Sequence, residues 1–141
     1  MNSLNKKIDT WIFDLDNTLY SADSGIFQQV HKLMGEFIQE HLKVDIKEAK
    51  EMQKKYYKEH GTTLRGMMDN HNVDPDYFLE KVHKLDYSIV GANNKLNQEL
   101  KKLDGKKIIY TNANMQHVSS VLEKIKLSDF FDYVFDIKMA N

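Results

Sequence analysis

Residues 10–20 read TWIFDLDNTLY, an apolar run that turns acidic after four residues. The β-branched and aromatic residues at 10–13 predict a buried strand, and the acids that follow predict a turn at its end. A second run of this kind covers 107–110 and ends in Thr111 and Asn112. Both predicted strands are therefore followed at once by polar side chains.

Helices are expected between the strands. Apolar residues at helical spacing, bracketed by helix-start and helix-stop residues, cover 26–42, 45–61, 64–68, 74–82, 96–105 and 115–125, and a third strand is expected at 133–137. Strands that alternate with helices predict a parallel α/β sheet. The stretch 21–88 is too long for a simple crossover, so we interpret it as a helical insert.

Composition narrows the function classes. The chain has 141 residues, a formal net charge of -1 and no cysteine. The near-neutral charge gives no electrostatic reason to expect nucleic acid or membrane as a partner. Without cysteine there is no disulfide, thiolate metal site or cysteine nucleophile, which fits a cytoplasmic location. Lys6 and Lys7 precede an apolar stretch that Asp14 interrupts, so neither a signal peptide nor a membrane span is expected.

The polar residues after the strands form the candidate site, because open parallel sheets bind ligands at the carboxyl ends of their strands. Asp14 could attack phosphorus as a nucleophile, and Asp16 could protonate the leaving oxygen and later activate water. We expect Mg²⁺ beside Asp14 and Asp16, because it prefers carboxylate and phosphate oxygens. The alternative is a pair of turn residues. A calcium loop does not fit, because Leu19 and Gly25 occupy its glycine and glutamate positions.

The segment 11–20 resembles the first motif of the haloacid dehalogenase (HAD) superfamily, in its phosphatase form. The resemblance implies that Asp14 is the nucleophile and Asp16 the acid/base, and Asp16 is the residue that dehalogenases lack. The segment 108–111 is similar to the second motif, which implies that Thr111 and the backbone of Asn112 bind phosphate. Taken alone, Thr111 and Asn112 would also suit a polar strand-to-helix turn.

The insert resembles the helical cap of pyrimidine 5'-nucleotidase-type members, through Tyr56-Tyr57, 61–66, Asp74-Pro-Asp and 82–88. This resemblance implies a nucleoside monophosphate or a similar small phosphate ester as substrate. The cap residues expected to face it are Thr62, Thr63 and Arg65, of which Arg65 could pair with phosphate or stack on a base. Alternatively, the threonines only cap a helix and Arg65 is a surface charge.

The implied fold is α/β, a HAD-type Rossmann-like parallel sheet with a helical cap inserted after the first strand. The expected division is 1–20 and 91–141 for the core and 21–90 for the cap. The family's later lysine and acidic motifs have no counterpart before Asn141, and Lys138 is a poor substitute for that lysine. We therefore expect a truncated core, weak Mg²⁺ binding and low activity.

Two further interpretations stay open at this point. The chain could be a non-catalytic HAD fragment or interaction module, or a HAD phosphatase for sugar phosphates. The six histidines show no metal-ligand spacing, so each is expected at the surface or at its boundary. Tyr56, Tyr57 and the methionines are expected to pack inside the insert. The sequence does not specify an oligomeric state.

Overall fold

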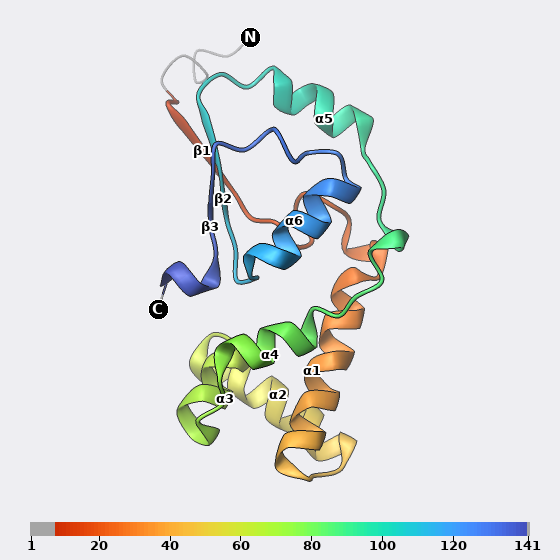
Figure 1. Ribbon diagram of the computed structural model, residues 1–141, viewed down its shortest axis with the longest axis vertical. Coiled ribbons are helices and arrows are strands. Elements are labelled where there is room, and N and C mark those ends of the chain that lie inside the picture. The colour runs from red at the N-terminus through yellow and green to blue at the C-terminus, as the bar shows by residue number, and fades with distance from the viewer. Residues whose placement is uncertain (1–7, 141) are drawn as a thin grey trace. The chain divides into compact units, whose positions relative to one another are not determined.

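The computed structural model describes residues 8–140 (Figure 1). The chain divides into two compact units, one formed by the segments up to Phe27 and from Asp86, the other by Gln28–Leu85. The first unit holds the predicted strands, and the second holds most of the predicted insert. The interpretation of the 28–85 unit as a substrate cap stays a prediction.

The first unit is built on three parallel strands in the order β1-β2-β3, where β1 is Thr10–Phe13, β2 is Lys106–Tyr110 and β3 is Tyr133–Phe135. Phe13 lies beside Ile109 and Tyr110 beside Phe135, so the carboxyl ends of all three strands meet at one edge. The sequence prediction of a parallel α/β sheet is confirmed. The third strand ends at Phe135 instead of continuing to 137, because the chain turns into a 3₁₀ segment at Ile137–Ala140.

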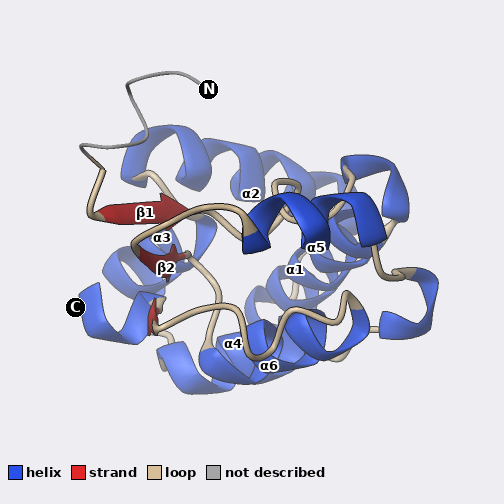
Figure 2. Cartoon of the chain, turned by 90° about the horizontal axis from the view of Figure 1, so that it is seen from above, coloured by secondary structure: helices blue, strands red, loops and turns tan. Residues whose placement is uncertain are grey.

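Helices α5 (Asn94–Lys101) and α6 (Met115–Lys124) lie on the same side of this sheet (Figures 1 and 2). The alternation of side chains along the strands fits this one-sided cover. Ile109 is fully buried, whereas Ile12 on the other face is 69% exposed and Tyr110 is 55% exposed. The hydrophobic core of the unit lies on the face of the sheet that α6 covers. Leu15 and Leu127, both fully buried, complete this core.

The second unit consists of most of α1 (Ile26–Leu42), then α2 (Ile46–His60), α3 (Thr63–His71) and α4 (Pro75–Val82). Each of the last three begins at a side-chain cap that accepts a hydrogen bond from the first turn: Asp45 from Glu48, Thr62 from Arg65 and Asp74 from Tyr77. These caps were all predicted, because Asp and Thr satisfy the free N–H groups of a helix start. Within residues 8–140, no helix combines the length and apolar character needed to cross a membrane.

One packing expectation for this unit is wrong in part. Tyr56 is buried, and its hydroxyl lies 2.6 Å from Nε2 of His71. Tyr57 is 67% exposed, because the next residue on a helix points about 100° away from its neighbour. Of the two tyrosines, only Tyr56 packs inside the insert, where Met67 is also fully buried as expected.

Candidate active site

The first element of the site is the turn after β1. Asp14 follows the last residue of the strand, and its carboxylate is exposed. One oxygen accepts a hydrogen bond from the backbone N–H of Leu15 at 2.9 Å, and the other accepts one from the Thr18 hydroxyl at 3.2 Å. The buried side chains of Leu15 and Leu19 hold the turn against the core. An exposed carboxylate is therefore kept in a defined place at the end of a strand.

The second element is the turn after β2, at the same edge of the sheet. Thr111 is buried, its N–H donates to the carbonyl of Phe135 at 3.0 Å, and its hydroxyl accepts from the N–H of Ala113 at 3.1 Å. Asn112 is exposed. The parallel register brings Asp14 and Thr111 to the ends of neighbouring strands, as the sequence predicted. The hydroxyl of Thr111 thus already stabilises the turn after β2.

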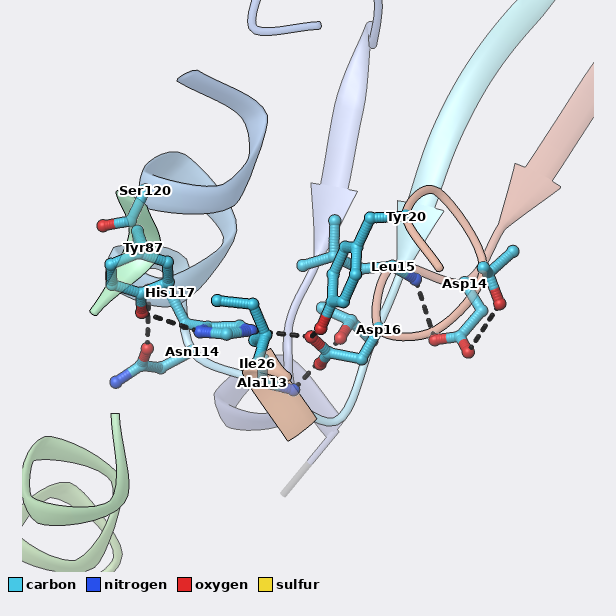
Figure 3. Close-up of polar contacts among 12 residues, drawn as sticks. Asp14, Leu15, Asp16, Tyr20, Ile26, Tyr87, Ala113, Asn114, His117 and Ser120 are labelled. Atoms are coloured by element: carbon cyan, nitrogen blue, oxygen red, sulfur yellow. Dashed lines mark hydrogen bonds and ion pairs between the residues drawn. The ribbon is translucent and has the colours of Figure 1, made fainter. Parts of the chain in front are cut away.

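The third element is a chain of hydrogen bonds around Asp16 (Figure 3). Oδ1 of Asp16 accepts from the Tyr20 hydroxyl at 2.5 Å and lies 2.7 Å from Nε2 of His117. Nδ1 of His117 in turn lies 2.8 Å from the Tyr87 hydroxyl. Figure 3 shows the imidazole between the phenol of Tyr87 and the carboxylate of Asp16. Asp16 is therefore tied to side chains from α6 and from the 3₁₀ turn Tyr87–Ile89.

Burial keeps both phenols of this chain protonated. Desolvation, followed by the nearby charge of Asp16, raises the pKa of Tyr20 far above its usual value. Desolvation likewise raises the pKa of Tyr87 to about 12. A buried phenolate would lose its hydration without gaining a cation, so the neutral form is favoured. Tyr20 and Tyr87 can therefore act as hydrogen-bond donors at neutral pH.

The edge also has an acid after β3. Asp136 is buried, and its carboxylate accepts hydrogen bonds from the N–H groups of Met115 and Met139, both at 3.2 Å. It therefore holds the start of α6 against the end of β3. Within residues 8–140, no group of three or more His, Cys, Asp or Glu side chains is placed to hold a metal ion.

Comparison with known proteins shows the family of the chain. The family model of haloacid dehalogenase-like hydrolases matches residues 8–139. The chain belongs to this family of hydrolases. The HAD resemblance noted in the sequence is thus confirmed, and so is the α/β core that it implied.

A curated relative of this HAD-like hydrolase is "Phosphate metabolism protein 8" of Saccharomyces cerevisiae. The two sequences are 26% identical over 134 residues, which cover 86% of this chain and 41% of the yeast protein. The chain therefore spans about two fifths of the length of that relative. Neither comparison specifies a substrate for the chain.

The expected cap residues lie in the other unit of the hydrolase and have structural contacts there. The hydroxyl of Thr62 caps α3, and the buried hydroxyl of Thr63 donates to the carbonyl of Gln53 at 3.3 Å. Arg65 is half-exposed and forms an ion pair of 3.1 Å with Asp69, one helical turn away. Their role toward a substrate stays a prediction.

The expectation that every histidine lies at or near the surface is wrong for His117. Its side chain is fully buried. Burial is possible because both ring nitrogens have polar partners inside the protein, which offsets the cost of removing them from water. The available signal was the position of His117 in the first turn of the helix that follows Thr111 and Asn112, at the edge that also carries Asp14 and Asp16.

Proposed function

We propose that this HAD-like hydrolase cleaves phosphomonoesters through an aspartyl-phosphate formed on Asp14. The observation that supports this most directly is the exposed, hydrogen-bonded carboxylate of Asp14 at the end of β1, with Asp16 two residues later. In a parallel α/β sheet that edge is where ligands bind. Family membership supplies the reaction class, hydrolysis.

In the first step a carboxylate oxygen of Asp14 forms a bond to phosphorus, and the ester oxygen leaves with the bonding electrons. Asp16, protonated at this stage, donates its proton to that oxygen so that an alcohol departs. In the second step Asp16 accepts a proton from water as the water oxygen attacks the phosphoryl group. Asp14 is thereby released, and inorganic phosphate is the second product.

Phosphate binding is assigned to Thr111 and the backbone N–H of Asn112. These groups follow β2 at the same edge as Asp14. The hydroxyl of Thr111 accepts a hydrogen bond from Ala113, so its own proton can be directed to a phosphate oxygen. The exposed position of Asn112 leaves room for a ligand next to its backbone.

The oxygen donors at this edge suit Mg²⁺. Mg²⁺ usually takes one or two carboxylates, with substrate phosphate and water completing its six ligands. The exposed carboxylate of Asp14 and the backbone carbonyl of Asp16 are such donors, and two protein ligands imply weak binding before phosphate arrives. When bound, the ion would neutralise charge on the phosphoryl oxygens.

The proposed substrate class is nucleoside monophosphates, as in pyrimidine 5'-nucleotidases. The support is the resemblance of the 28–85 unit to the cap of those enzymes, in which Thr62, Thr63 and Arg65 would face the nucleoside or its phosphate. Sugar phosphates are the competing substrates within the same reaction. A substrate panel separates the two, because the reaction at Asp14 would be common to both.

The test is release of phosphate from UMP, CMP, a sugar phosphate and an aryl phosphate, with Mg²⁺ and with a chelator. Replacing the nucleophile in Asp14→Asn is expected to lower turnover by about a thousandfold or more, because the covalent route is lost. The matched control is Asp129→Asn, an exposed acid outside the site. Hydrolysis that survives Asp14→Asn, or none from the folded unmodified chain, would refute the proposed function.

A further inference from the structure

The buried histidine of α6 is the strongest feature that the family assignment leaves without a role. Its ring is removed from solvent, and each nitrogen lies within 2.8 Å of an oxygen. The backbone N–H of His117 also donates to the Asn114 side chain at 3.0 Å, which fixes the start of the helix. Such a residue has a fixed ring orientation, since rotation would break both ring contacts at once.

We propose that His117 is a positioning residue for Asp16, donating a hydrogen bond from Nε2 to Oδ1 of that carboxyl. The Tyr87 hydroxyl, 2.8 Å from Nδ1, is the partner of the other ring nitrogen and keeps the ring in this orientation. The proposal rests on the proposed function in one respect, which is that Asp16 is the general acid/base. The contact itself does not depend on that function.

The direction of the hydrogen bonds follows from the chemistry of the partners. An ionised carboxylate can only accept, so the ring nitrogen facing Oδ1 of Asp16 must supply the proton. When Asp16 acts as the general acid, its own proton would be on Oδ2, and Oδ1 would still accept. The Tyr87 hydroxyl can donate to Nδ1 or accept from it, so its contact with the ring is compatible with a proton on Nε2 in either case.

Two donors on the same oxygen would fix the plane of the carboxyl group. Oδ1 of Asp16 is 2.5 Å from the Tyr20 hydroxyl and 2.7 Å from Nε2 of His117. Tyr20 belongs to the same local segment as Asp16, whereas His117 is 101 residues away in the sequence. A general acid/base must lie within hydrogen-bond distance of the oxygen that gains or loses the proton. Loss of the hydrogen bond from His117 would let the Asp16 carboxyl turn away from that position, so we expect it to lower the rate of the chemical step.

The first test does not require that the protein be catalytically active. Long-range proton–nitrogen NMR of the chain labelled with ¹⁵N-histidine reports which ring nitrogen carries the proton. We expect a proton on Nε2 of His117, with a resonance that shifts in Asp16→Ala and stays unchanged in Asp129→Asn. An Nε2 without a proton, or an Nε2 resonance that is unchanged in Asp16→Ala, would overturn the proposal.

The second test separates positioning from packing by a pair of variants. In His117→Gln the amide nitrogen reaches about as far as Nε2 and can still donate, whereas in His117→Asn it reaches only as far as Nδ1. We expect His117→Asn to lower kcat by about tenfold or more with KM within about twofold, and His117→Gln to restore most of kcat. The exposed His31→Gln serves as control.

Equal kcat in the Asn and Gln variants, with both folded, contradicts a positioning role. If the unmodified chain releases no phosphate, the proposed function fails, and the NMR result alone decides whether His117 holds Asp16. The two failures are therefore distinguishable.

Discussion

Gly35 and Gly66 are buried glycines inside helices of the 28–85 unit, and alanine at each is expected to change stability in opposite directions. At Gly35 in α1, an added Cβ would lie 3.5 Å from Oε1 of Gln53, an ordinary contact distance. At Gly66 in α3, the same atom would overlap Cβ and Cγ of Tyr56. These Tyr56 atoms lie next to the backbone of α2, so rotation of the ring cannot move them away.

The magnitudes follow from two terms. Alanine is favoured over glycine in a helix interior by about 1 kcal/mol, and this term applies to both sites. Gly35→Ala is therefore expected to raise the free energy of unfolding by about 0.5–1 kcal/mol. An overpacked core costs about 1–3 kcal/mol, and an overlap this severe belongs at the upper end. Gly66→Ala is thus expected to lower the free energy of unfolding by about 1–2 kcal/mol.

Urea unfolding followed by far-ultraviolet circular dichroism measures both changes. The decisive control is the double-mutant cycle with Tyr56→Gly, which removes the overlapping Cβ and Cγ together with the ring. In that background Gly66→Ala should cost much less than in the unmodified chain. If both alanine variants are stabilised equally, or if Tyr56→Gly leaves the cost of Gly66→Ala unchanged, the packing argument is wrong.

Two further predictions concern pH and helix capping. The pKa of Tyr87 rises from an ordinary 10.0 to about 12 in the folded protein, so the stability from its neutral form is complete below pH 10 and is lost as pH rises toward 12. Between pH 10 and pH 12, the free energy of unfolding measured by urea titration should therefore fall less in Tyr87→Phe than in the unmodified chain. Parallel curves of this free energy against pH would contradict the prediction. Asp45→Ala should lower the free energy of unfolding by about 0.5–2 kcal/mol, because the Glu48 N–H loses its acceptor, while Asp45→Ser should retain most of it. Equal losses in the alanine and serine variants would rule out a capping role.

Much of the local structure could be predicted from the sequence. The start of α4 at Asp74-Pro75 is an example, because Asp accepts from the first turn and proline already has a helical φ. The turn after β1 is another, because a short apolar run ending in acids cannot continue as a buried strand. In both cases the deciding contacts lie within a few residues of each other.

Other features depended on contacts that local patterns do not contain. The third strand was expected to reach 137 but ends at Phe135, and the N–H of Ile137 donates instead to the carbonyl of Ala113 at 3.1 Å. Ala113 is distant from Ile137 in the sequence, so this partner could not be identified from spacing or hydropathy alone.

The sequence by itself determined the parallel α/β core, the helix starts and the acids at the end of β1. Short-range hydrogen bonding and hydrophobic periodicity are encoded in neighbouring residues, so they can be read along the chain. Only the tertiary structure decided that His117 is buried and that its ring lies between Tyr87 and Asp16. That arrangement depends on the parallel pairing of β1 with β2, which brings α6 to the turn after β1 across more than one hundred residues of sequence.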